Sequence, residues 1–151
     1  YKEVPYEAMI KPIIEGGTLY ENLVRPEHAK ECVGSCYDCL RDFSNQKYHH
    51  ILSWRLGLDL ARLSANKCQD ISFDTPYWAD YINGHIKDIF KEDNVDVKLK
   101  KGFMEMTKNG NHFYVIYPFW SEKYVEEQIG KPLSDIKKIS IFDLSKHLNL
   151  Q

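Results

Sequence analysis

The chain has 151 residues, a formal net charge of −2 and 43% hydrophobic residues, enough for an ordered domain with its own core. The near-neutral charge excludes a protein that holds nucleic acid through a uniformly basic surface. We find no secretory signal and no apolar run near the roughly 18 residues of a membrane helix. We therefore expect a cytoplasmic protein without a membrane partner, and, since it starts at Tyr1 instead of Met, a fragment or processed chain.

Residues 1–15 have a mixed pattern that fits either a strand or a short helix, interrupted by Pro5 and Pro12. Gly16 and Gly17 mark a turn that needs backbone freedom. A short helix is expected over residues 18–23. Another is expected from Pro26, because proline's missing N–H costs nothing in a first helical turn.

Three of the four cysteines follow within eight positions, at Cys32, Cys36 and Cys39. Their spacing suits a tetrahedral Zn²⁺ ion better than disulfides, because short loops can bring several sulfurs within about 2.3 Å of one ion. Three thiolates and one imidazole make a closed shell, which is typical of structural and not of catalytic zinc. A redox dithiol and inert thiols are the alternatives.

The fourth ligand has three candidates. His49 and His50 lie ten and eleven residues after Cys39, at the start of a predicted helix. Cys68 lies beyond the far end of that helix, about 27 Å away at 1.5 Å per residue. We favour His49 and keep His50 and Cys68 as alternatives. The predicted metal ligands are therefore Cys32, Cys36, Cys39 and His49.

The predicted helix that follows the cysteines spans residues 48–65. Leucines recur along it at helical spacing and define one apolar face; they are Leu52, Leu56, Leu60 and Leu63. Arg55, Asp59 and Arg62 lie together on the other side, where their spacing allows ion pairs. A second amphipathic helix is predicted over residues 76–91, with Thr75 as its N-cap and Pro76 at its first position.

The period then changes from 3.6 to 2, which indicates strands. Strands are predicted over residues 95–100, 103–108 and 112–120, with the third in a central position, and over 139–142. Asn109-Gly110 is a strong hairpin signal. Short helices are predicted over 122–129, between Ser121 as cap and Gly130 as stop, and over 144–148.

These elements predict an α+β fold, in which a helical zinc-knuckle part precedes a small antiparallel β-meander with short helices. We expect a single domain over residues 1–151, with a helical part (1–70) that carries the cysteines and a helix-plus-meander part (71–151).

Two further patterns concern nucleic acid. Asp96-x-Lys98 resembles the end of a metal-dependent nuclease site, for which Asp74 or Asp80 would supply another acid. Lysines give the meander one basic edge that could touch DNA phosphates, although a solvated face is the default interpretation; they are Lys98, Lys100, Lys101 and Lys108. No motor motif or HExxH motif is present, so we expect no enzyme activity in the chain itself.

The segment from Ser35-Cys36-Tyr37-Asp38-Cys39-Leu40-Arg41 to Ser53-Trp54-Arg55-Leu56-Gly57 resembles the cysteine-rich C-terminal domain of superfamily 2 DEAD/DEAH-box helicases, called the MrfA zinc-binding domain. Similar domains occur in DrmB of the DISARM system and in other anti-phage defence proteins. Many members have four cysteines in the knuckle, whereas this chain has three.

The resemblance implies a non-catalytic zinc-binding accessory domain that braces a helicase motor or a defence complex and is a candidate to contact DNA. Its partners would be helicase motor domains or defence-complex subunits. A metal-dependent nuclease and a zinc-stabilised protein–protein adaptor are the alternatives.

Overall fold

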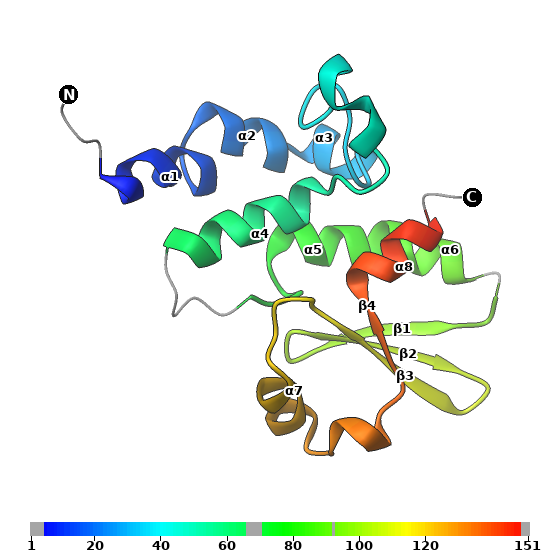
Figure 1. Ribbon diagram of the computed structural model, residues 1–151. Coiled ribbons are helices and arrows are strands. Elements are labelled where there is room, and N and C mark those ends of the chain that lie inside the picture. Colours follow the sequence, from blue (N-terminus) through cyan, green and yellow to red (C-terminus); the bar gives the residue numbers. More distant parts are fainter. Residues whose placement is uncertain (1–4, 66–70, 92, 149–151) are drawn as a thin grey trace. The chain divides into compact units, whose positions relative to one another are not determined.

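The computed structural model describes residues 5–65, 71–91 and 93–148, and the chain divides into two compact units, residues 1–71 and 72–151 (Figure 1). The first unit is helical and the second is built on a four-stranded sheet. The predicted α+β class, with a helical part before a β-meander, is confirmed. No helix in the described part of the chain is both long and apolar enough to cross a membrane.

The first unit packs short helices against one longer helix. Helix α1 packs along α4, and the chain continues from α1 through α2 to α3, each of which contacts the next. The buried side chains include Leu23 of α2 and Trp54 and Leu58 of α4. The elements are α1 (Tyr6–Ile14), α2 (Thr18–Val24), α3 (Pro26–Glu31), the 3₁₀ segment η1 (Phe43–Tyr48) and α4 (Trp54–Ala65).

Helix α4 begins six residues later than predicted. The Ser53 hydroxyl accepts a hydrogen bond from the Leu56 N–H at 3.4 Å, and the Ser53 carbonyl accepts from the Gly57 N–H at 2.9 Å. These bonds make Ser53 the local start of the helix. The residues before it form η1, whose start is capped by Asp42.

The second unit opens with a helix that spans the predicted residues 76–91 but contains a π-helical turn. It runs through α5 (Pro76–Tyr81), the π turn η2 (Ile82–Ile86) and α6 (Lys87–Lys91). Thr75 holds the N-cap position, but its hydroxyl donates to the Ser72 carbonyl oxygen at 3.1 Å instead of capping the helix.

The sheet has the order β1-β2-β3-β4 and is mixed. The first three strands form the predicted antiparallel meander, and the last strand joins parallel to β3. The third strand ends at Ile116, four residues earlier than predicted, and residues 117–120 turn away. The strands are β1 (Asp96–Lys100), β2 (Phe103–Lys108), β3 (Asn111–Ile116) and β4 (Lys138–Ser140).

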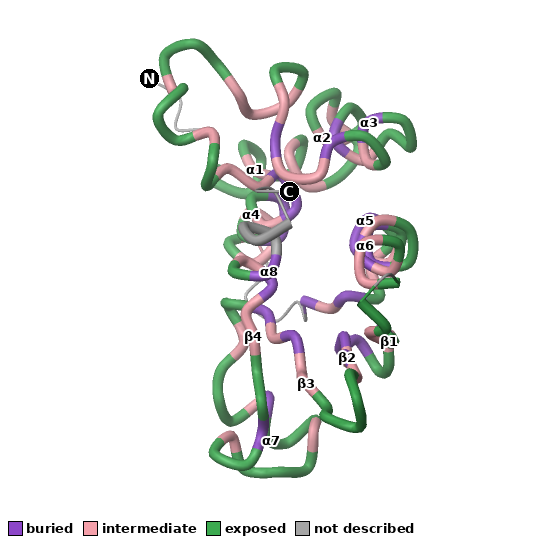
Figure 2. The backbone as a smooth tube through the Cα atoms, turned by 90° about the vertical axis from the view of Figure 1, so that its right-hand side faces the viewer, coloured by how far each residue is buried: buried purple, intermediate pink, exposed green. Residues whose placement is uncertain are grey.

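Helices cover both sides of this sheet to different extents. Helices α5, α6 and α8 (Ile141–Leu148) lie on one side, and α7 (Glu122–Ile129) lies on the other (Figures 1 and 2). Buried residues on the first side of the sheet are Val97, Met104, Met106 and Val115. Helix α7 is capped by Ser121 and ends at Gly130 (φ 74°), as predicted.

Candidate metal centre

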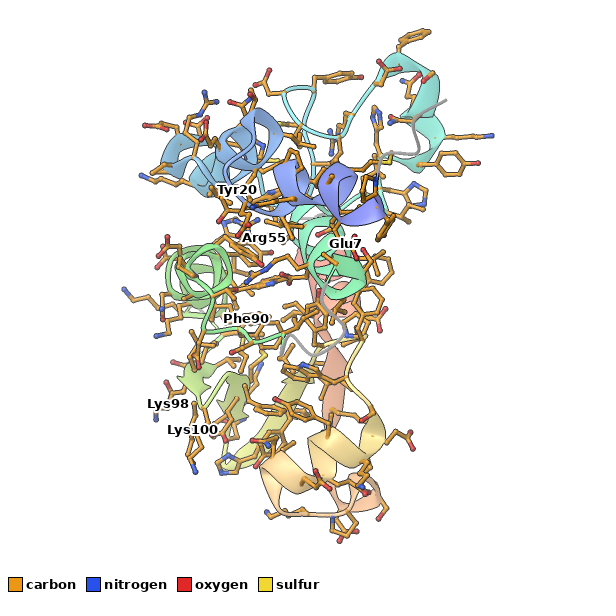
Figure 3. All side chains as sticks on the ribbon, turned by 90° about the vertical axis from the view of Figure 1, so that its left-hand side faces the viewer. Glu7, Tyr20, Arg55, Phe90, Lys98 and Lys100 are labelled. Carbon is orange, nitrogen blue, oxygen red and sulfur yellow. The ribbon has the colours of Figure 1, made fainter. Side chains whose placement is uncertain are left out.

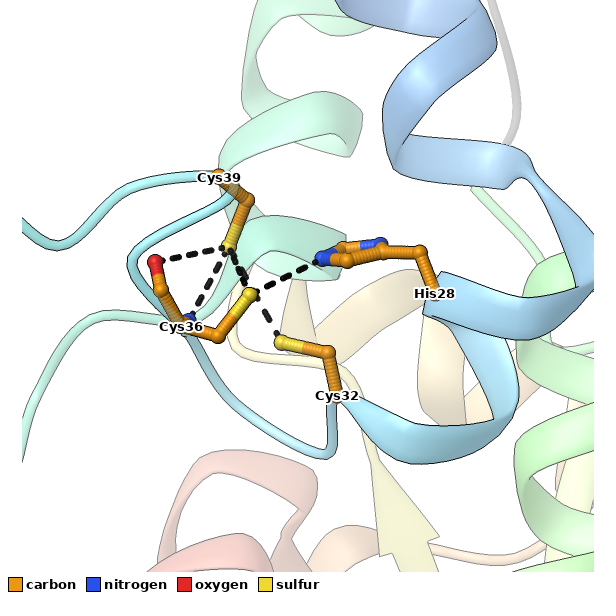
Figure 4. Close-up of side chains that lie close together, drawn as sticks. All are labelled: His28, Cys32, Cys36 and Cys39. Carbon is orange, nitrogen blue, oxygen red and sulfur yellow. Dashed lines mark hydrogen bonds between the residues drawn. The ribbon is translucent and has the colours of Figure 1, made fainter.

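The three clustered cysteines lie beside His28, and not beside His49 (Figure 4). Their four ligand atoms all lie within 4.8 Å of one another. Cys39 Sγ is 3.8 Å from Cys32 Sγ and 3.7 Å from Cys36 Sγ. His28 Nε2 is 3.4 Å from Cys36 Sγ. Within residues 5–65, 71–91 and 93–148, this is the one group of three or more such side chains close enough to share an ion.

Three of the six separations between these atoms match the edges of a zinc tetrahedron. With Zn–S distances of about 2.3 Å and a Zn–N distance of about 2.0 Å, tetrahedral angles give S···S edges of about 3.8 Å and S···N edges of about 3.5 Å. Two of the three S···S distances are 3.7 and 3.8 Å, and one of the three S···N distances is 3.4 Å. The donor set and its spacing therefore fit a metal ion such as Zn²⁺.

The His28 ring is held in the tautomer that a ligand needs. Its Nδ1 lies 2.8 Å from the Leu23 carbonyl oxygen, which can only accept, so Nδ1 carries the proton and donates. The Nε2 lone pair is then directed at the sulfurs. A carbonyl that orients a histidine through its second nitrogen is the usual outer partner of a metal-binding imidazole. The side chain is 6% exposed and packs against the Trp54 ring.

Local structure places the four donors. His28 lies in α3 and Cys32 ends it, so the two are one helical turn apart and share a face. Cys36 and Cys39 lie on a tight turn, in which the Cys36 carbonyl accepts from the N–H groups of Cys39 and Arg41 at 3.2 and 2.9 Å. The Cys36 N–H donates to Cys39 Sγ at 3.1 Å, a bond that favours a thiolate.

Burial opposes ionisation of these thiols in the absence of a cation. Burial, followed by the charge of Cys39, raises the pKa of Cys32. Burial also raises the pKa of Cys39, while the Cys36 N–H partly opposes that rise. A bound cation would displace the thiol protons and supply the missing positive charge. The cluster is thus poorly suited to an exposed, reactive dithiol and well suited to a closed metal site.

Helix α4 holds the cysteine loop through backbone carbonyls. The indole N–H of Trp54 donates to the Cys32 carbonyl oxygen at 2.9 Å. The Arg55 guanidinium donates to the carbonyl oxygens of Ala29 (2.7 Å), Val33 (3.0 Å) and Cys32 (3.1 Å). Arg55 and Asp59 are each only 1% exposed, whereas Leu60 is 51% exposed, so the predicted division of α4 into an apolar and a charged face is wrong.

His49 stands outside the cluster. Its Nε2 lies 2.8 Å from Asn45 Oδ1 and 3.1 Å from the Asp42 carbonyl oxygen, and its ring meets Tyr37 edge-on. The correction follows from the late start of α4, because residues 43–51 form their own small turn instead of folding back onto the sulfurs. His50 is exposed and is not part of the cluster. Cys68 lies outside the described residues.

A sequence signal for His28 did exist. His28 and Cys32 are four residues apart, which is about one helical turn, and Pro26 already predicts a helix at that point. Two ligand types four residues apart on a helix share a face, so this histidine could have been placed with the cysteines.

The residues proposed for a nuclease do not form a metal site. Lys98 Nζ is 2.6 Å from an Asp96 carboxylate oxygen in an exposed ion pair. Neither Asp96 nor Asp74 nor Asp80 belongs to a ligand group within the part of the chain that the structure describes. The four lysines predicted to touch DNA are exposed on β1, on the turn after it and at the end of β2; they are Lys98, Lys100, Lys101 and Lys108.

Comparison with protein-family models, with curated proteins and with solved structures finds no match to this chain.

Proposed function

We propose that this chain is a non-catalytic zinc-binding accessory domain of a DNA helicase or anti-phage defence complex. The observation that carries the zinc part is the buried to half-buried group of three sulfurs and one correctly oriented imidazole, whose ligand atoms all lie within 4.8 Å of one another. Four protein donors leave no open position for a substrate or an activated water, which favours a structural ion. Its role is to tie α3 and the cysteine loop into one rigid body.

The assembly part rests on the resemblance of the segment around Cys36 and Cys39 to the helicase-associated domain. That segment continues into Trp54 and Arg55, and these two side chains hold the carbonyls of the cysteine loop. Sequence likeness and structural role thus coincide at the same residues. The partners would be helicase motor domains or defence-complex subunits, in the cytoplasm.

Metal analysis of matched variants tests the zinc site. The purified chain should contain about one zinc per molecule, and Cys39→Ser and His28→Asn should each lose it, because both remove one of four ligands. His49→Asn and Cys68→Ser should keep their zinc and serve as matched controls. Inductively coupled plasma mass spectrometry after gel filtration gives the stoichiometry. Zinc retained in His28→Asn but lost in His49→Asn or Cys68→Ser would refute the assigned ligand set.

A further inference from the structure

The sheet of the second unit has one face that helices cover only at one end. Cross-strand pairing places Lys98, Glu105, Tyr114 and Lys138 directly opposite one another, one on each strand. Side chains alternate along a strand, so this face is opposite to the buried one. Its covered end lies at Phe103, which packs against Trp120 and Tyr124. We call the remainder the open face; its residues are Asp96, Lys98, Lys100, Glu105, Thr107, His112, Tyr114 and Lys138.

Charge is segregated toward this sheet. The strands and their turns (residues 96–116 and 137–140) carry six lysines and two acids. The rest of the unit (72–95, 117–136 and 141–151) carries five lysines and ten acids. A chain with net charge −2 therefore concentrates positive charge on one element, which is the pattern that attracts a polyanion.

The lysines are available to phosphates. Lys98 pairs with Asp96 at 2.6 Å and Lys100 with Glu105 at 4.0 Å, both lysines being well exposed. Exposed pairs of this kind contribute little free energy, so a phosphate can replace the carboxylate. Figure 3 shows both side chains pointing away from the ribbon. Among the described residues, no carboxylate lies within 4.0 Å of Lys138, the third lysine of the open face.

Two rings lie between these cations. Tyr114 is half-buried in the middle of the open face, and His112 is exposed two residues before it on β3. His112 Nδ1 is 3.2 Å from the hydroxyl of Thr107, its cross-strand partner, which restrains the imidazole. Rings fixed on a strand and flanked by lysines form the stacking platforms that bind unpaired bases.

We propose that the open face binds single-stranded nucleic acid, with phosphates on the lysines and bases stacked on Tyr114 and His112. A duplex is disfavoured because its bases are already stacked on one another and cannot reach the rings. Binding is independent of base sequence, since every base has a stacking face. This inference rests on the proposed function only in its expectation that the chain works in an assembly that handles nucleic acid. It does not depend on the zinc site, which lies in the other unit.

Fluorescence anisotropy with the full chain tests this. The probe is a labelled oligothymidylate of about 15 nucleotides, a length in the range that one such platform covers, compared with a hairpin duplex of equal length. We expect the single strand to bind more tightly than the duplex. Tyr114→Leu should weaken binding about five- to 150-fold. Tyr114→Phe should bind as tightly as the unchanged chain, because the ring remains. Lys98→Gln and Lys138→Gln should each lower the slope of log K against log salt by about 0.7.

Matched controls change residues that are not part of the open face. Tyr6→Leu on α1 and Lys123→Gln on α7 change exposed residues of the same types and should leave affinity and salt slope unchanged. Circular dichroism verifies that each variant is folded. Equal affinity for duplex and single strand, equal effects of test and control variants, or no binding at low salt would overturn the inference. No binding at low salt would favour a protein partner for this face. The zinc stoichiometry does not depend on the outcome of these binding measurements. Likewise, a chain that binds no zinc would not decide whether the open face binds nucleic acid.

Discussion

At the scale of single residues, Arg55 joins the end of α3 and the start of the cysteine loop to helix α4. One guanidinium donates to three carbonyl oxygens at the end of α3 and just beyond it, and it also lies 4.3 Å from the Trp54 ring centre. The last carbonyls of a helix have no partner within the helix, and the negative end of its dipole favours a cation there. The planar guanidinium of arginine, with its five N–H donors, suits this arrangement, whereas the ammonium group of lysine does not.

Replacing Arg55 should therefore cost stability without removing a metal ligand. Arg55→Met keeps much of the apolar stem but removes the side-chain donors to three carbonyls. The Cys32 carbonyl keeps its bond from the Trp54 indole, whereas those of Ala29 and Val33 lose their Arg55 donor, so we expect the free energy of unfolding to fall by about 3 kcal/mol. Urea titration at saturating zinc measures it. Arg25→Met is the matched control, because Arg25 is exposed and its ion pair is with exposed Glu27; its change should stay within about 0.5 kcal/mol. An equal loss in both variants would contradict the role of Arg55.

The same scale shows why the sequence placed three metal ligands but not the fourth. The cysteines are close neighbours in the chain, so spacing alone brings them together. His49 looked suitable only because a helix was expected from residue 48. Local bonds of Asp42 and Asn45 close a separate turn there instead: the Asp42 N–H donates to Asn45 Oδ1 at 2.9 Å, and Ser44 N–H donates to Asp42 Oδ1 at 2.8 Å. That competing turn carries His49 away from the sulfurs.

At the scale of elements, local signals predicted most boundaries. The hairpin turn has positive φ at Asn109 (51°) and Gly110 (77°), as the Asn-Gly pair predicts. Helix α7 keeps its predicted cap and stop. Elements that depend on distant partners were predicted less well. The parallel pairing of β4 with β3 depends on the path of the chain through α7, and no pattern within residues 138–140 encodes it.

Two glycines of the first unit should respond oppositely to alanine. Gly57 lies inside α4, and a Cβ there would meet nothing within 4 Å, so Gly57→Ala should raise the free energy of unfolding by about 0.5–1 kcal/mol. At Gly17 a Cβ would overlap the Pro12 carbonyl oxygen, so Gly17→Ala should lower it by about 1–3 kcal/mol. Urea titration of both at saturating zinc compares them. Stabilisation of the chain by Gly17→Ala would contradict the close approach of Gly17 to the Pro12 carbonyl.

At the scale of the whole molecule, the two units differ in what stabilises them. The first has small helices, buried charges at Arg55 and Asp59, and the four-donor cluster. The second has a continuous aromatic and aliphatic core around its sheet, with Phe73 contacting the rings of Trp78, Tyr117 and Trp120. Small domains with a limited core commonly need a metal, whereas a sheet covered by helices on one side does not. The ion should therefore matter to one unit only.

Removing the metal from the intact chain tests this division. A chelator should abolish amide hydrogen-exchange protection in residues 26–41, because binding of a structural zinc and folding of its site are coupled. Protection of β2 and β3 should persist, since their hydrogen bonds and core lie in the other unit. Hydrogen exchange read by mass spectrometry resolves the two regions, and added zinc should restore protection. Cys36→Ser without chelator should reproduce the pattern. Simultaneous loss of protection in both units would mean that the zinc site supports the whole chain.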